Sequence, residues 1–272
     1  MEAAAPKTTK ILAPCARAER GRRTCFSISP DKATLAYCSK KNIVFRSLKD
    51  PNDVRIFNLH GAETPLVVRF CPGNDLIASG DSKGIVKVWV INAKGEVLDK
   101  GNFNCFNGPV RDLAWSEDGK KVIAVGGAEP FAKLISVDLQ TTKGDEIGHS
   151  KEILSVAVRT KRPFMATTGG SDFILGHHKF PPLTNLTLQK DHTNFVNSIA
   201  YSADNDMFVS ASSDKSVMLW EAGTGKAVDV KFEVEHAMSV MDVAWVDAEQ
   251  FITASNDGTL KLWNKKGGAS VK

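Results

Sequence analysis

The sequence predicts an all-β propeller, a ring of small antiparallel sheets, and three observations lead to this fold class. A short motif of alternating apolar residues before a polar break occurs six times, at intervals of 42 to 45 residues. Within each unit the apolar residues recur with a period of two, as in strands, and the breaks are rich in Gly, Asp, Asn and Ser. Units of about 40–45 residues that hold four short strands are typical of propeller blades.

The six units follow one another between residues 24 and 264. We expect three strands in each unit and a fourth strand in each of the five links, giving six blades or an incomplete seven-bladed ring. Residues 1–23 are expected to form an N-terminal arm, whose residues 8–13 (TTKILA) supply a closing strand beside the last unit. Residues 265–272 are expected to form a flexible tail. The apolar motif of successive units ends at Ile28, Phe70, Trp115, Val158, Tyr201 and Trp245.

Polar residues recur at fixed positions in the last three units. A His precedes an Asp by 21 to 23 residues, a hydroxyl residue lies four before that Asp, and a Trp lies six after it in units five and six. A catalytic triad would occur once, so the repetition favours a structural hydrogen-bond network over a hydrolase site. The predicted network consists of His149, Thr168, Asp172, His192, Ser210, Asp214, Trp220, His236, Thr253, Asp257 and Trp263.

This pattern resembles the WD-repeat family, whose blades join His, Ser or Thr, Asp and Trp by hydrogen bonds. The resemblance implies a propeller that serves mainly as an interaction platform. Earlier units depart from the pattern. The first has neither the His nor the Trp, the second has Lys83 where the Asp is expected, and the third has the enlarged turn GGAEPFAK.

The chain offers no motif that indicates catalysis or a bound cofactor. His177 and His178 replace the end of the expected Trp strand, and as strand neighbours they would point to opposite faces and share no metal. The five cysteines have no Cys-x-x-Cys spacing, and there is no HExxH, GxSxG or phosphate-binding glycine loop. We therefore expect no enzyme, no cofactor and no metal.

Composition and charge are ordinary for a globular protein, with 42% hydrophobic residues and a net charge of +4. The start MEAAAPKTTK lacks the apolar core of a signal peptide, and no stretch is long enough for a membrane helix. We expect a cytoplasmic monomer that binds neither membranes nor nucleic acids. Basic residues cluster at Arg17, Arg20, Arg22 and Arg23, which either contact an acidic partner or lie on a solvated arm.

The atypical units carry a more specific resemblance. The runs FNGPVRDLAWSEDGKKVIAVGG and IGHSKEILSVAVRTKRPFMATTGGSDF, followed by PPL and DHTNFVNSIAYSAD, resemble the N-terminal half of the actin-interacting protein 1 family. Members of that family are double propellers that assist cofilin in dismantling actin filaments. The resemblance implies a non-enzymatic, cytoskeletal module that binds actin filaments and cofilin (actin-depolymerising factor) and promotes filament disassembly. The alternative is a general WD-repeat scaffold for a multiprotein complex.

The sequence also departs from this family in two respects. The family has two seven-bladed propellers in about twice this length. An aromatic residue that it tends to place shortly after a Pro-Pro pair is not evident after Pro181 and Pro182, where LTN follows. The second departure puts part of an inherited actin-binding surface in doubt.

A partner-binding surface is expected at the end of the propeller where the His loops and the Asp turns of a WD repeat lie. By resemblance, Glu129, Asp172 and Phe195 match positions that the family uses against actin and cofilin. Asp172 also belongs to the structural network, and Phe195 could instead pack between blades. We define the candidate surface as Glu129, Phe131, Lys151, Glu152, Asp172, Phe173, Asn194 and Phe195.

Overall fold

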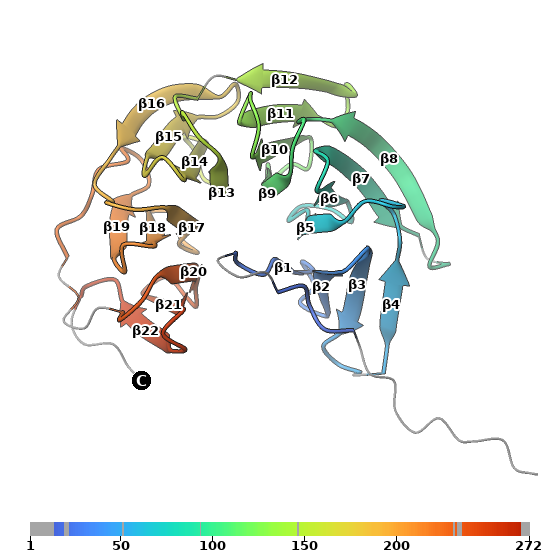
Figure 1. Ribbon diagram of the computed structural model, residues 1–272, viewed down its shortest axis with the longest axis horizontal. Helices are drawn as coiled ribbons and strands as arrows, with labels where there is room; N and C mark the ends of the chain where they lie inside the picture. Colours follow the sequence, from blue (N-terminus) through green and yellow to red (C-terminus); the bar gives the residue numbers. More distant parts are fainter. Residues whose placement is uncertain are drawn as a thin grey trace, which may run out of the picture.

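The chain folds into six antiparallel sheets that stand as blades around a common centre (Figure 1). The computed structural model describes residues 14–18, 22–50, 52–92, 94–145, 147–230, 232 and 236–267. Within these residues the regular elements are 22 strands, numbered from the inside of each blade outwards in chain order. The predicted all-β propeller of six blades is therefore confirmed.

The strands follow the six sequence units. The bounds in blades one to three are β1 (Phe26–Ile28), β2 (Thr34–Ser39), β3 (Asn42–Ser47), β4 (Val54–Phe57), β5 (Pro65–Phe70), β6 (Ile77–Asp81), β7 (Ile85–Ile91), β8 (Val97–Asn104), β9 (Val110–Trp115), β10 (Lys121–Gly126), β11 (Ala132–Ser136) and β12 (Thr141–Asp145). Those in blades four to six are β13 (Ile153–Arg159), β14 (Met165–Gly170), β15 (Leu175–Lys179), β16 (Thr184–Gln189), β17 (Val196–Tyr201), β18 (Met207–Ser212), β19 (Val217–Glu221), β20 (Val240–Trp245), β21 (Gln250–Ser255) and β22 (Leu260–Asn264).

The link after blade five differs from the expectation of a fourth strand. Blades one to four each have that strand, whereas blade five has only a bridge between Trp220 and Ala227 in the described residues. The backbone N–H of Val228 also donates to the carbonyl of Leu219 at 2.8 Å. Phe232, farther along the link, packs on the core between blades five and six. Side-chain packing thus replaces a regular ladder in this link.

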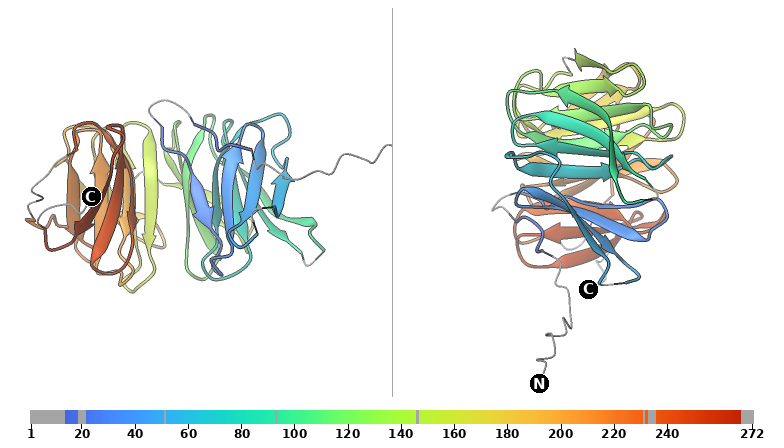
Figure 2. Two further views of the ribbon diagram at one scale, coloured as in Figure 1. Left: turned by 90° about the horizontal axis from the view of Figure 1, so that it is seen from below. Right: turned by 90° about the vertical axis from the view of Figure 1, so that its right-hand side faces the viewer.

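The hydrophobic core lies between neighbouring blades, which are stacked side by side (Figure 2). Between blades one and two, the ring of Phe45 packs edge-on against Phe70 and Trp89, with centroids 5.5 and 5.6 Å apart. Tryptophans of the inner strands add hydrogen bonds across blades. The indole N–H of Trp245 on β20 donates to the carbonyl of Ala200 on β17 at 3.0 Å. Each blade is therefore stabilised mainly by the face it shares with the next blade.

Blades one and six flank an opening in the ring (Figures 1 and 2). The face of blade six that points away from blade five has the same apolar pattern as the corresponding face of blade five. Leu262 pairs with Ile252 as Leu219 pairs with Val209, yet Leu219 is buried and Leu262 is half-buried. Leu260 on the same face is 64% exposed. The expected closing strand, residues 8–13, lies outside the described residues.

Candidate functional site

Hydrogen-bonded sets of four residues join the strands of blades five and six. In blade five, Nδ1 of His192 lies 3.0 Å from Oδ2 of Asp214, and Nε2 lies 2.8 Å from Oγ of Ser210. The indole N–H of Trp220 donates to the same hydroxyl oxygen at 2.8 Å. Blade six has equivalent distances of 3.0, 2.7 and 2.7 Å for the pairs His236–Asp257, His236–Thr253 and Trp263–Thr253. Each set ties the loop before the inner strand to the turn between the second and third strands.

Blade two contains a complete set, although the sequence pattern placed Lys83 at the Asp position. Asp81 supplies the carboxylate, because its Oδ2 lies 2.9 Å from Nδ1 of His60. The backbone N–H of Lys83 instead donates to Oδ1 of Asp81 at 2.9 Å. The expectation was wrong because the Asp here ends strand β6 and lies two residues after Ser79, not four. Counting from His60 would have found it, since the interval of 21 residues equals that in blade six.

In blade four a histidine takes the position of the tryptophan. Nε2 of His178 lies 2.9 Å from Oγ1 of Thr168, which also lies 2.8 Å from Nε2 of His149. His177 faces the other side of the sheet, where Nδ1 lies 3.0 Å from Oγ1 of Thr167. Burial lowers the pKa of His178 to about 3 and that of His177 to about 4, so both rings stay neutral. Among the described residues, no cluster of three metal-ligating side chains occurs.

Asp172 holds the turn of blade four together. Its carboxylate accepts the backbone N–H groups of Ser150 at 2.9 Å and Ile174 at 3.2 Å, and it lies 3.0 Å from Nδ1 of His149. Burial would raise the pKa of Asp172, but the hydrogen bond from His149 and the two backbone donors hold it below the usual value. The residue is only 8% exposed. Its carboxylate therefore lies within the scaffold beneath the candidate surface.

Phe173 and Phe195 form the aromatic part of the candidate surface. Phe195 is 44% exposed, and its ring lies 5.8 Å from that of half-buried Phe173, centroid to centroid. Phe173 has a φ of 70°, a left-handed conformation that follows directly from the tight turn after Asp172. The side chain of Asn194 accepts the backbone N–H of Phe195 at 2.8 Å. Two loops from different blades thus present one apolar contact area.

The turn between β10 and β11 contributes the third-blade part of the candidate surface. Glu129 is exposed, whereas Phe131 is half-buried and packs against the core between blades three and four. Lys151, in the loop before β13, is exposed as well. Glu129 and Lys151 can therefore contact a partner directly, while Phe131 supports the turn.

Glu152 connects the two halves of the candidate surface. A β-carbon built on Gly127 in the third-blade turn would lie only 3.1 Å from Oε1 of Glu152. The backbone carbonyl of Glu152 accepts the N–H of Ser171 at 2.8 Å, next to the aromatic pair. Its carboxylate also pairs with two arginines, Arg22 and Arg111. Glu152 therefore lies between the third-blade turn and the turn that carries Phe173, but its carboxylate is held by ion pairs of its own chain.

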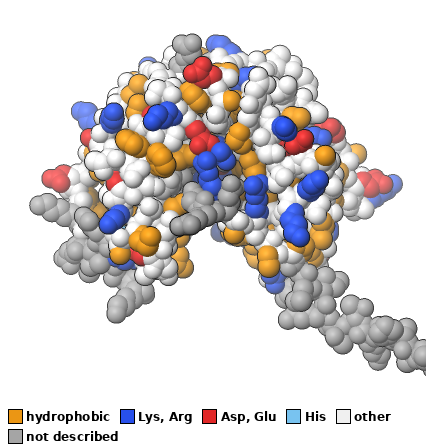
Figure 3. Space-filling view, in the orientation of Figure 1, with side chains coloured by type: hydrophobic (Ala, Val, Ile, Leu, Met, Phe, Trp, Pro, Cys, Tyr) orange, Lys and Arg blue, Asp and Glu red, His pale blue; other side chains and the backbone are white. Residues whose placement is uncertain are grey.

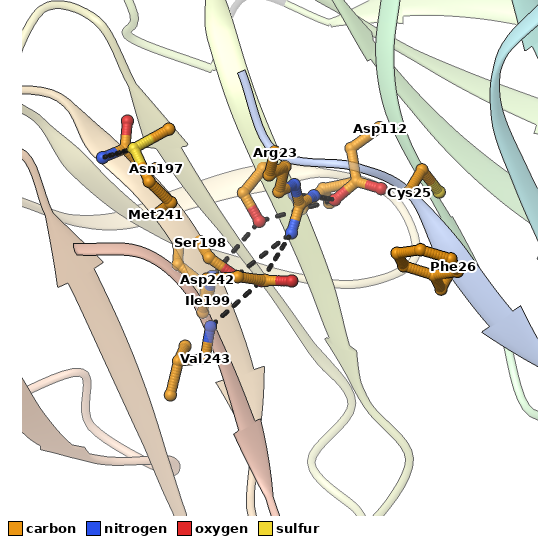
Figure 4. Close-up of polar contacts among 12 residues, drawn as sticks. Arg23, Cys25, Phe26, Asp112, Asn197, Ser198, Ile199, Met241, Asp242 and Val243 are labelled. Carbon is orange, nitrogen blue, oxygen red and sulfur yellow. Dashed lines mark hydrogen bonds and ion pairs between the residues drawn. The ribbon is translucent and has the colours of Figure 1, made fainter. Parts of the chain in front are cut away.

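An ion-pair network in the centre of the ring was not anticipated from the sequence. The guanidinium of Arg23 pairs with Asp112 of blade three, donates to Oγ of Ser198 of blade five at 3.1 Å, and lies 3.5 Å from Asp242 of blade six (Figure 4). Arg69 also pairs with Asp112, at 2.7 Å. Burial would raise the pKa of Asp112, but the two arginines hold it below the usual value. The basic segment around residue 23 therefore contacts the inner strands of its own propeller. The sequence suggested instead that this segment contacts an acidic partner or lies on a solvated arm.

Three segments of the chain match a family model described as "WD domain, G-beta repeat". They are residues 52–90, 183–221 and 230–264. Blades two, five and six, which contain the complete hydrogen-bonded sets, supply most of these residues. No helix of the described part is long and apolar enough to cross a membrane.

Curated relatives extend the similarity to most of the chain. The chain is 32% identical over 220 residues to WD repeat-containing protein 1 of Gallus gallus, covering 80% of this chain and 36% of that protein. It is 32% identical over 208 residues to Actin-interacting protein 1-2 of Arabidopsis thaliana, covering 76% and 34%. With Actin-interacting protein 1 of Drosophila melanogaster it shares 30% over 236 residues, covering 86% and 38%. The chain thus spans less than two fifths of the length of these relatives.

Among solved structures, a chain of the "Crystal Structure of Mitotic Checkpoint Complex" has a similar fold. The TM-score is 0.77, and the match covers 97% of this chain and 87% of that chain. Because the sequence identity is 16%, this likeness concerns the fold only.

Proposed function

Because the chain is a WD-repeat β-propeller related to the actin-interacting protein 1 family, we propose that it is a non-enzymatic module that binds actin filaments and promotes their cofilin-dependent disassembly. The observation that carries the proposal is the 30–32% identity, over at least three quarters of the chain, to proteins named for interaction with actin. The ring contact between exposed Phe195 and half-buried Phe173, at the expected end of the propeller, supports it. Association with the cytoskeleton belongs to the same proposal.

The candidate surface has the composition of a protein-binding site. An exposed aromatic residue, Phe195, lies next to a second ring, and Glu129 and Lys151 are exposed in loops of blades three and four. Aromatic residues at the centre of an interface, surrounded by polar residues, often contribute most of the binding energy. We assign direct contact to these residues together with Phe173 and Asn194.

The three remaining residues of the candidate surface have supporting roles in this proposal. The carboxylate of Asp172 binds His149 and two backbone N–H groups, so it shapes the turn that presents Phe173. Phe131 packs into the core, and Glu152 pairs with arginines. Substitutions here are expected to act on binding through the shape of the loops.

A non-catalytic role is supported by the state of the Ser, His and Asp residues. In blade five, Ser210 is fully buried and already bonded to both His192 and Trp220. Its hydroxyl is therefore not presented to a substrate, as a nucleophile must be. The same arrangement in blades two and six favours a structural role for all these sets.

Co-sedimentation with actin filaments, with and without cofilin, tests the proposal. We expect Phe195→Ala to weaken binding to cofilin-decorated filaments about 30-fold, because loss of a central interface aromatic costs roughly 2 kcal/mol. The matched control is Phe26→Ala, since Phe26 is 47% exposed and its ring lies 5.9 Å from that of Tyr37 in blade one. The control should bind as the natural chain does.

Two results would contradict the proposal. If the natural chain does not sediment with filaments in either condition, the actin-binding function is wrong and a scaffold function is favoured. If Phe195→Ala binds normally, or loses binding only in proportion to a lowered melting temperature, the candidate surface is wrong.

A further inference from the structure

We propose that a groove at the opposite end of the propeller from the candidate surface binds an extended segment of a partner protein, in which apolar residues are followed by acidic ones. This site does not depend on the proposed function. The groove lies between blades three and four, where β13 ends at Arg159, and continues along blade four past the end of β15 at Lys179. The candidate surface lies where β13 begins, so a partner in the groove leaves it free.

The groove consists of two hollows with a shared apolar floor. The first hollow has a volume of about 250 Å³ and the second about 350 Å³, and Phe164, Phe180 and Pro181 line both. Phe180 is buried in the core between blades three and four, and Phe164 packs on the same core. Exposed apolar residues, among them Pro182 and Leu186, line the second hollow. A groove with exposed walls suits an extended chain better than a small molecule, which binds where most of its surface is enclosed.

The turn between β15 and β16 is apolar, whereas the corresponding turns of blades two and five are polar. In blade two, Oδ1 of Asn92 accepts the backbone N–H of Glu96 at 2.9 Å, and in blade five Oγ1 of Thr224 accepts that of Lys226 at 3.2 Å. Blade four has Phe-Pro-Pro-Leu at residues 180–183, with both prolines exposed. A polar turn suffices elsewhere, and exposed apolar surface that the fold does not require is typical of a binding site.

Basic side chains without an acidic partner flank the second hollow. Lys179 lines it and is exposed, and no ion pair joins it to another residue in the described part of the chain. Arg162 is also exposed, and its guanidinium contacts only the ring of Phe164, 5.7 Å from the centroid, among the described residues. Lys161 differs, since it pairs with Asp206 at 2.8 Å. Carboxylates of a bound segment would therefore meet two available cations here.

The charges of the two hollows give the bound segment a direction. Two acidic residues, Glu117 and Asp118, and two basic residues, Lys121 and Arg159, line the first hollow, so neither sign is in excess. The single charged residue among the described residues that line the second hollow is Lys179. The first hollow therefore accepts an uncharged apolar side chain, and the second attracts the acidic residues that follow it.

The basic residues at the centre of the ring do not offer a comparable site. Basic and acidic side chains lie close together at the centre of the molecule in Figure 3. Arg22 and Arg111 pair with Glu152, and Arg23 pairs with Asp112. Ion pairs within the chain thus use these basic groups, in contrast to those beside the second hollow.

Fluorescence anisotropy with a labelled Phe-Pro-Leu-Glu-Asp-Glu peptide tests the groove. We expect binding that weakens as salt is raised, because the acidic residues contact exposed cations. A peptide with Lys in place of its acidic residues should not bind. Leu186→Gln removes an apolar contact of the second hollow, and Lys179→Glu reverses its charge. Each should weaken binding of the acidic peptide at least about fivefold.

Each variant has a control that carries the same substitution elsewhere on blade four. Leu188 lies on the same strand, β16, and is 44% exposed against 42% for Leu186, but it does not line the groove. Lys190 is exposed and follows the far end of β16. Leu188→Gln and Lys190→Glu should both bind the peptide normally. If Leu186→Gln lowers the melting temperature, Lys179→Glu, at an exposed strand end, decides the test.

Several results would overturn the site. They are failure of the natural chain to bind the acidic peptide, equal affinities of the natural chain, Leu186→Gln and Lys179→Glu, and binding of phosphatidylserine vesicles in place of the peptide. Self-association that is lost in Leu186→Gln would assign the groove to a second copy of the chain instead.

The same measurements separate this site from the proposed function. Phe195→Ala should bind the peptide as the natural chain does, because Phe195 lies at the other end of the propeller. Peptide binding that depends on Leu186 and Lys179, in a chain that does not sediment with actin filaments, supports the groove and removes the actin-binding function.

Discussion

Buried histidine residues make blade four sensitive to acid. His177 occupies the position that is Leu134 in blade three, Leu219 in blade five and Leu262 in blade six. Its ring stacks on Phe208, with centroids 5.6 Å apart. Burial lowers its pKa to about 4, so the folded state stays neutral at a pH where the unfolded chain already takes up a proton. Stability is therefore lost as the pH falls from about 6.5 towards 4.

We expect His177→Leu to remove this loss. The variant should be more stable than the natural chain by roughly 1–2 kcal/mol at pH 5, with a smaller difference at pH 7.5. Urea unfolding at the two pH values measures it. A difference that does not change with pH would contradict the assignment, and Lys179→Leu on the exposed end of the same strand is the control.

At the scale of the strand and the blade, the free energy of unfolding that a leucine contributes depends on whether a neighbouring blade covers it. Leu219 and Leu262 have the same residue type and the same pairing, but a following blade covers only Leu219. We expect Leu219→Ala to cost about 2–5 kcal/mol and Leu262→Ala to cost less than about 1 kcal/mol. Denaturant unfolding of the two variants gives the comparison.

The size of the Leu262 effect also reports on the opening in the ring. A cost equal to that of Leu219→Ala would mean that this face of blade six is covered in solution, and the expected asymmetry would be wrong. Leu139→Ala, at a turn position that is 72% exposed, serves as the baseline for an uncovered leucine.

At the scale of the whole molecule, Arg23 joins blades that are far apart in the chain. Its partners are Asp112, 89 residues away, and Ser198, 175 residues away, in addition to Asp242. We expect Arg23→Met to lower the free energy of unfolding by about 3 kcal/mol, because it removes one of two arginines from a buried carboxylate. Thermal unfolding measures the loss.

The pH dependence of this variant identifies the carboxylate. Arg23 and Arg69 hold the pKa of Asp112 below its usual value, so Asp112 contributes stability above pH 4 that is lost as the pH falls further. Arg23→Met should therefore lose less stability than the natural chain as the pH falls below 4. If the natural chain and the variant show parallel pH profiles between pH 5 and 2.5, Asp112 does not carry the effect; Arg46→Met, on blade one, is the matched control.

Local patterns allowed much of the fold and part of the site to be predicted. Period-two alternation, polar turns and the regular His-to-Asp interval depend on residues close in sequence, so they determined six blades and the hydrogen-bonded sets of blades five and six. The resemblance of the atypical units to the actin-interacting family came from continuous runs in the same way. The exposure of Phe195 could not be predicted from these local patterns, because alternation alone does not show which face of a strand a neighbouring blade covers.

Only the tertiary structure decided what meets across blades. It paired Glu152 with Arg22 and Arg111, and Arg23 with Asp112. These contacts depend on the curvature of the ring, which brings the inner strands to a common centre regardless of their separation in sequence. The sequence by itself therefore determined the repeating blade, and the arrangement of the blades around Arg23 decided which charged residues pair with one another.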